Sequence, residues 1–206
     1  MGRPQVPLVD PEVAVTKALE IIDRDGLAAL SLRRLGAELG VTGAALYHHF
    51  ADKEEILRGV TDLVIRREVI PTIPGGTWEE YVLQSVSRYR AALLAHPNAA
   101  PLMTPPGGQV VADNLRREFI VTKMLDSGVP RRLCYPILDS MEIMAFGSAM
   151  TNLRRLPLHE RLGLYDRSEH PNLQKVVRAT PKSAERLFRL ELEALLTGWK
   201  TLISGE

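Results

Sequence analysis

Tyr47 and His48 are the residues whose chemistry and spacing most clearly fit contact with another molecule. In a helix they would share the outer surface with Gly43 and Ala44, which precede them by about one turn. Small residues let a helix backbone approach a partner closely, and hydroxyl and imidazole groups can bond to phosphates and base edges. This combination is typical of a short helix that enters the major groove of DNA.

The segment before these residues has the features of a helix that ends in a tight turn. Ser31 can cap the first turn with its hydroxyl. Gly40 favours a helix end, because the residue past a helix often needs the left-handed backbone that glycine adopts without a Cβ clash. Between them, four residues recur with helical spacing and form one stripe: Leu32, Leu35, Gly36 and Leu39.

A second short helix is predicted after this turn. Val41 is the apolar residue of the turn, and Thr42 can cap a helix from Gly43 to about Phe50. Leu46 and Phe50, four residues apart, would face inward. Two helices joined by Gly-Val-Thr can also form an ordinary corner between packed helices, so this pattern alone leaves both interpretations open.

The residues that follow favour the DNA-binding interpretation. Asp52 and Glu55 have the spacing of a capping box and open a third helix, with Lys53 in its first turn and its end at about Glu68. The segment LGVTGAALYHHFADKEEIL resembles the DNA-binding segment of TetR-type transcriptional regulators, and the run L-Y-x-H-F-x-x-K-E is its most specific part. The resemblance covers about Pro11 to Leu63, and a weaker match, W-x-x-Y…LL-x-HP-x-A, begins at Trp78.

This resemblance implies an all-α protein. A three-helix DNA-binding head with a helix-turn-helix would be followed by a helical body that binds a ligand and dimerises. Eight positions would contact DNA, and two of them, Tyr47 and Lys53, would also bind phosphates: Arg33, Thr42, Gly43, Ala44, Ala45, Tyr47, His48 and Lys53. Gly-Ala-Ala stands where longer polar side chains can occur, so methyl contacts to thymine and operator shape would contribute to recognition.

The charge distribution limits how such a protein could bind DNA. The 206 residues have a net charge of +1, and residues 1–70 contain nine Lys or Arg against eleven Asp or Glu. A general nucleic-acid coat would be basic. Binding must therefore depend on a few placed cations and weaken as salt rises; the candidates are Arg3, Arg33, Arg34 and Lys53.

Composition excludes several classes of protein. A chain that is 45% hydrophobic and 25% charged is typical of globular proteins and long enough to bury a core. The single cysteine, Cys134, excludes an internal disulfide and is either a half-buried helix residue or a redox sensor. No apolar run approaches the ~20 residues that cross a bilayer, and no signal peptide is evident, so we expect a cytoplasmic protein.

Proline and glycine mark the predicted domain boundaries. Residues 1–9 form an arm that is either disordered or places Arg3 in a minor groove. The segment IPTIPGGT, residues 70–77, is the clearest boundary. We therefore expect a DNA-binding domain with its connecting helix at residues 10–69, and a ligand-binding and dimerisation domain at residues 70–206. Within the first domain, Asp10 can cap a helix that starts at Pro11 and is closed by Gly26.

The predicted body contains long helices separated by loops. TPPGG at residues 104–108 is a loop without the lysine and hydroxyl of a phosphate cradle. Residues 154–182 form a long loop with short helical fragments at most and one helix near 172–178. The expected long helices cover about 78–95, 109–125, 130–153 and 181–203. Thr77 and Glu80 have the spacing of a second capping box, which opens the first of them. The residues of this helix that would face the body are Tyr81, Val82, Ser85, Val86 and Tyr89.

The helix expected at 130–153 is rich in methionine, which is flexible and polarisable, so it could line a cavity, pair with a second copy or simply pack in the core. Apolar helices with sparse polar groups also favour a pocket for a small, largely apolar effector. The pocket candidates are Tyr81, Ser85, Tyr89, Met103, Met124, Met141, Met144 and Asn152. The broad apolar face of the last helix favours self-association.

Catalytic and metal chemistry lack support in the sequence. Asp139 and Glu142 have the spacing of a carboxylate pair, but no suitable histidine or nucleophile lies nearby, so a solvated or ion-paired face is favoured. The five histidines have no partners at metal-ligand spacing, and the fingerprints of nucleophilic and dinucleotide-dependent enzymes are absent. We therefore expect no enzyme and no cofactor.

The favoured hypothesis is a repressor that binds a palindromic double-stranded DNA operator as a homodimer and is released by a small molecule. Two reading helices would lie about one helical turn of DNA apart, roughly 34 Å. The effector would favour a different dimer geometry and so lower operator affinity. A helical enzyme and a non-DNA interaction module, each with an incidental helix corner, remain the alternatives.

Overall fold

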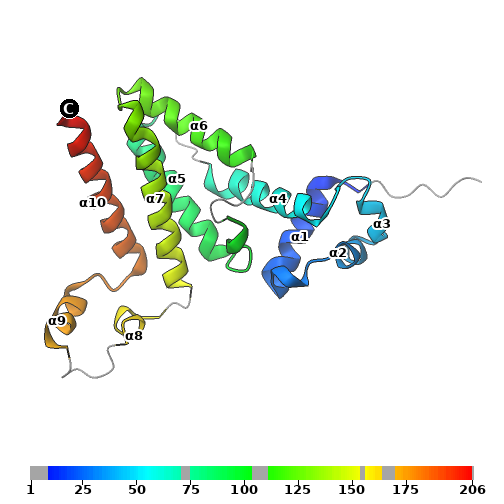
Figure 1. Ribbon diagram of the computed structural model, residues 1–206. Coiled ribbons are helices and arrows are strands. Elements are labelled where there is room, and N and C mark those ends of the chain that lie inside the picture. The colour runs from blue at the N-terminus through cyan, green and yellow to red at the C-terminus, as the bar shows by residue number, and fades with distance from the viewer. Residues whose placement is uncertain (1–8, 71–74, 104–110, 154–155, 164–169, 206) are drawn as a thin grey trace, which may run out of the picture. The chain divides into compact units, whose positions relative to one another are not determined.

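The computed structural model describes residues 9–70, 75–103, 111–153, 156–163 and 170–205 (Figure 1). Throughout these ranges the regular elements are helices, which confirms the predicted all-α class. The arm with Arg3 and the TPPGG loop lie outside the described residues. Among the helices in these ranges, none has both the length and the apolar character needed to cross a membrane.

The chain is divided into two compact units. The first comprises Met1–Thr72 and Ala91–Ile120, and the second comprises Ile73–Arg90 and Val121–Glu206. The first division falls inside the Pro- and Gly-rich segment 70–77. Nothing in the sequence indicated that residues 91–120 would group with the N-terminal unit.

The N-terminal unit begins with the predicted helix. The Asp10 side chain accepts a hydrogen bond from the Glu12 N–H at 2.8 Å, Pro11 is the first helical residue, and Gly26 follows the end with φ 88°. The elements that follow along the chain complete the head: α1 (Pro11–Asp25), η1 (Leu27–Ala29), α2 (Leu32–Leu39), α3 (Gly43–Leu46), α4 (Lys53–Val64) and η2 (Ile65–Val69).

One apolar core connects α1, α2, α3 and α4 (Figure 1). Its largest side chains are almost fully buried: Ile21, Ile22, Leu35, Leu46, Ile56 and Leu63. Each such side chain contributes about 1.5–3 kcal/mol relative to an exposed position. Because Leu35 and Leu46 enter the same core, α2 and α3 have fixed places on α1 and α4.

Helix α4 changes type at its end. The Ile70 N–H donates to the Ile65 carbonyl at 3.2 Å, a bond that spans five residues and defines the π-helical η2. The helix therefore extends to about Glu68, as predicted. Such π-helical turns are rare and often lie at functional sites.

Helix α5 (Trp78–Ala95) begins at the second predicted capping box. The Glu80 N–H donates to Thr77 Oγ1 at 3.3 Å, and the Thr77 N–H donates to Glu80 Oε2 at 2.8 Å. Helix α5 is followed by η3 (Ala100–Met103) and α6 (Val111–Asp126). The residues that were predicted to face the body are buried: Tyr81, Val82, Ser85, Val86 and Tyr89.

In the second unit, α7 (Arg131–Asn152) contacts α10 (Ala184–Ser204). Phe188, Leu192 and Leu196 of α10 are buried. The Trp199 indole N–H donates to Ser140 Oγ at 3.1 Å. This polar contact adds to the apolar packing between the two helices and fixes their register.

The segment between α7 and α10 contains more helix than expected. Helix α9 (Pro171–Ala179) confirms the prediction near 172–178, whereas α8 (Leu158–Arg161) is a short fragment whose position was not predicted. Arg161 Nη1 donates to Asn152 Oδ1 at 3.0 Å and so fastens α8 to the end of α7. A four-residue helix has little stability of its own, so tertiary contacts rather than local propensity account for it.

Candidate DNA-binding surface

The caps predicted for the helix-turn-helix are confirmed. Ser31 Oγ accepts a hydrogen bond from the Arg34 N–H at 3.2 Å, and Thr42 Oγ1 accepts one from the Ala45 N–H at 3.3 Å. Gly40 ends α2 with a left-handed φ of 70°. These three residues define where each helix starts or stops and therefore the length of the turn between them.

Gly36 allows α2 and the turn to approach each other closely. A Cβ atom at this position would lie 2.9 Å from the Gly43 nitrogen and 2.9 Å from the Val41 oxygen, both of them backbone atoms. Real side chains do not tolerate such separations, so the approach requires glycine. Gly43 has more room, because a Cβ there would lie 3.4 Å from the backbone of Arg33.

Helix α3 is shorter than predicted and ends at Leu46 rather than near Phe50. The N–H groups of His48 and His49 bond to carbonyls three residues back, at 3.3 and 3.0 Å, which tightens the chain into a turn. Tyr and His are weak helix formers. Phe50, only 6% exposed, anchors the end of the turn in the core.

The outer surface of this segment carries most of the predicted contact residues. Tyr47 is 60% exposed, and Thr42, Ala44 and His48 are also exposed, with Gly43 half-buried. Ala45 is an exception. It is 7% exposed and belongs to the buried residues of α3, so the expectation that it lies on the outer face is not met.

Arg33 and Arg34 are neighbours in sequence but differ in their surroundings. Arg33 is exposed and Lys53 is half-buried, and within the described residues neither makes an ion pair. Arg34 instead pairs with Asp25 and lies 3.6 Å from Glu38 Oε1. The sequence had grouped both arginines among the cations available to DNA.

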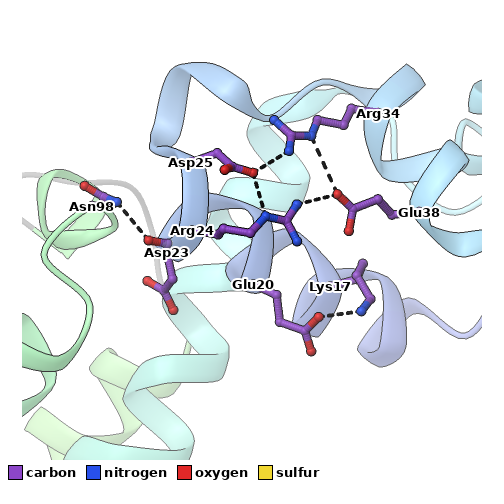
Figure 2. Close-up of polar contacts among 8 residues, drawn as sticks. All are labelled: Lys17, Glu20, Asp23, Arg24, Asp25, Arg34, Glu38 and Asn98. Atoms are coloured by element: carbon purple, nitrogen blue, oxygen red, sulfur yellow. Dashed lines mark hydrogen bonds and ion pairs between the residues drawn. The ribbon is translucent and has the colours of Figure 1, made fainter.

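Arg34 belongs to an ion-pair network between α1 and α2 that consists of Arg24, Asp25, Arg34 and Glu38 (Figure 2). Arg24 donates to Asp25 at 2.8 Å and to Glu38 at 2.5 Å. The hydrogen bonds from Arg24 hold the pKa of Asp25 and of Glu38 below their usual values. The network thus braces α2 against the end of α1.

Comparisons with known proteins agree with this geometry. Residues 15–60 match the family model of bacterial regulatory proteins of the tetR family. An HTH-type transcriptional regulator of Saccharopolyspora erythraea is 30% identical over 149 residues, which are 71% of this chain and 58% of the relative's length. ActR of Streptomyces coelicolor, solved with (S)-DNPA, is 27% identical with a TM-score of 0.74, over 94% of this chain and 98% of that chain.

The chain belongs to the TetR family of transcriptional regulators. A further TetR-like structure, of BioQ with its double-stranded DNA operator, is 26% identical with a TM-score of 0.66, over 93% of this chain and 98% of that chain. The matched residues of the TetR family model extend from α1 into α4 and include the caps, Gly36 and the exposed face of α3.

The residues predicted to contact an effector lie on several helices, with Met103 in the first compact unit and the other seven in the second. They are Tyr81, Ser85 and Tyr89 on α5, Met103 on η3, Met124 on α6, and Met141, Met144 and Asn152 on α7. All are buried except Met144, which is half-buried. Core packing and ligand binding both require burial, so their role stays a prediction.

Other sequence candidates have ordinary structural surroundings. Cys134 is 4% exposed, and burial raises the pKa of its thiol, which favours a packed residue over a reactive one. Asp139 accepts a hydrogen bond from the Tyr135 hydroxyl at 3.4 Å, whereas Glu142 is 8% exposed. The two carboxylates therefore differ in environment and do not form a shared exposed site.

Proposed function

We propose that this chain is a repressor that binds a palindromic DNA operator as a homodimer and is released by a small, largely apolar effector. The observation that carries the proposal is the exposed face at Thr42–His48. Its small residues precede a tyrosine and a histidine, and its caps and Gly36 hold it at a fixed place on the core. Such a face can approach bases and phosphates in the major groove.

Arg33 and Lys53 add the charge that DNA requires. Because the α1–α2 ion-pair network occupies Arg24 and Arg34, the cations proposed for DNA are few. The slope of log affinity against log salt depends on the number of phosphate contacts, so the loss of any one of a few contacts should change it measurably. We propose residues 10–69 as the DNA-binding domain and residues 70–206 as the ligand-binding and dimerisation domain.

Exposed rows on α7 and α10 support self-association. Residues four apart on one helix form a ridge that can pack into grooves of a partner helix. On α10 the exposed row comprises Leu190, Ala194, Gly198 and Leu202, with Leu190 and Leu202 55% and 57% exposed. On α7, Ile143 and Gly147 are exposed in the same spacing. A second copy of the chain would cover these rows.

The buried candidates on α5 and α7 support a body that accepts an effector. Aromatic and methionine side chains with a few hydroxyl and amide groups are typical of such sites. ActR, which was solved with (S)-DNPA, supports the same expectation. The effector would lower operator affinity by binding more tightly to a dimer geometry that does not fit the operator.

Selection of duplexes from a random DNA pool, followed by gel shifts with the purified chain, tests the proposal. We expect a palindromic consensus and weaker binding by Tyr47→Ala and Lys53→Ala. Lys175→Ala on α9, exposed and outside the proposed surface, is the matched control and should bind like the wild type. Absence of any selected sequence would favour an enzyme or a non-DNA interaction module.

Hydrogen exchange with and without a co-purified small molecule tests the effector site. We expect protection on α5 and α7, around Tyr81, Ser85, Tyr89 and Met141. Protection confined to exposed loops would reject the proposed pocket. Addition of the same molecule to the complex with selected DNA should release the protein from DNA.

A further inference from the structure

His96, the residue after α5, lies between two carboxylates from distant parts of the N-terminal unit. Its Nδ1 is 2.7 Å from Asp23 Oδ2 near the end of α1, and its Nε2 is 2.8 Å from Glu68 Oε1 on η2. The imidazole is 15% exposed. Asn98 Nδ2 donates to the Asp23 carbonyl at 2.9 Å, which adds a second link to the same point on α1 (Figure 2).

This arrangement requires a protonated ring. A neutral imidazole has one N–H and one acceptor nitrogen, so it cannot donate to two carboxylates, whereas the imidazolium has two N–H groups. Burial lowers the pKa of His96, but the hydrogen bonds to Glu68 and Asp23 raise it by more, so the pKa lies above its usual value. Asp23 Oδ1 is buried and, within the described residues, lacks a hydrogen-bond partner, so Asp23 depends strongly on this cation.

We propose that protonated His96 is a positioning residue that ties the end of α1 and the end of the α4–η2 helix to the segment after α5, and thereby sets operator affinity. The proposal rests on the proposed DNA-binding function. Helix α5 is continuous from Trp78 to Ala95 and carries three effector candidates. A displacement at its end would therefore reach the DNA-binding head through His96.

Asp23 and Glu68 are the charged side chains that face the ring. Arg24, next to Asp23, pairs with Asp25 and Glu38, and Arg67, next to Glu68, pairs with Glu12 at 3.0 Å. The short helix η3 that packs on α4 carries no titratable side chain. The arrangement is therefore complete at low pH and is lost as pH rises through the raised pKa of His96.

The first test uses the full chain without DNA. An NMR titration of the histidine ring protons should place the His96 midpoint above the ordinary histidine pKa of about 6.5. Asp23→Asn and Glu68→Gln should each lower the His96 midpoint. His96→Gln should speed hydrogen exchange at the end of α1 and at residues 65–70. A His96 midpoint at the ordinary histidine value, unmoved by either substitution, would overturn the proposal.

The second test measures operator affinity against pH with a duplex recovered by selection. All proteins carry His48→Gln, so that the proposed DNA-binding face itself carries no exposed histidine in the pH series. From pH 6 to 8.5, the parent protein, which keeps His96, should lose affinity for the duplex by about tenfold, within the range usual for coupling between sites. His96→Gln should bind weakly throughout with little pH dependence, and the control His159→Gln should follow the parent.

The two tests separate the possible failures. If no duplex binds any variant, the proposed function fails and the role in affinity fails with it, while the titration still establishes the ring's charge state. If DNA binds but His96→Gln follows the parent at every pH, only the role of His96 is overturned. Should His96→Gln not fold, Glu68→Gln takes its place. Because this substitution lowers the pKa of His96, we expect the variant to lose DNA affinity at a lower pH than the parent does.

Discussion

Replacement of Gly36 by alanine gives the sharpest test of how the DNA-binding face is positioned. The added Cβ would meet the Gly43 nitrogen and the Val41 oxygen at 2.9 Å and the Thr42 carbonyl carbon at 3.1 Å. All three are backbone atoms of the turn that leads into α3. Because a backbone cannot rotate away as a side-chain tip can, the turn itself must move.

The expected magnitude follows from two opposing effects. Alanine in place of glycine inside a helix stabilises by roughly 0.5–1 kcal/mol. Overpacking costs roughly 1–3 kcal/mol. The net loss of about 1–2 kcal/mol would lower Tm by roughly 2–8 °C for a chain of this size. A displaced Thr42–Gly43 segment would also lose contacts to DNA, so affinity should fall by about tenfold or more.

Gly43→Ala is the matched control for the stability measurement, and Lys175→Ala on α9 is the control for DNA affinity. The Cβ that Gly43→Ala adds would lie 3.4 Å from the Arg33 backbone, an ordinary contact, so the Tm of this variant should stay within about 2 °C of the wild type. Thermal unfolding followed by circular dichroism, and anisotropy with selected DNA, measure both effects. Unchanged stability and full DNA affinity in Gly36→Ala would refute the argument that the close approach fixes the turn.

Three further predictions concern charge and assembly. Because the proposed homodimer presents two copies of Arg33 to the operator, Arg33→Ala should reduce the slope of log affinity against log salt by about 2. Arg34→Ala should leave the slope unchanged and lower thermal stability instead. Asp25 and Glu38 of the α1–α2 ion-pair network have lowered pKa values, so they stabilise the fold above the ordinary carboxyl pKa. This stabilisation is lost as the pH falls through the lowered values. Between pH 6 and pH 3, the Tm of Arg24→Gln should therefore fall by less than the Tm of the wild type. Leu202→Glu should shift sedimentation toward the monomer and weaken DNA binding, while Leu173→Glu on α9 should do neither.

Much of the fold could be predicted because its signals are local. A cap and the N–H that it binds are two or three residues apart, as with Asp10 and Ser31. Helical spacing of apolar residues also lies within one segment, which explains why α1, α5 and α10 were found close to their actual limits. Helix α8 escaped prediction because the contact that fastens it comes from Asn152, outside the helix.

The sequence by itself determined the helix starts and stops, the apolar stripes and the exposed character of Tyr47 and His48, because each depends on neighbours within one or two turns. Only the tertiary structure showed that Gly36 is required by a close backbone approach and that Ala45 faces inward. It also showed that Arg34 is paired, whereas Arg33 has no ion pair with any residue that the structure describes. The environment of His96 is the clearest case, since its partners lie 73 and 28 residues away. No local pattern encodes such contacts; they exist only after the core has brought the separate helices together.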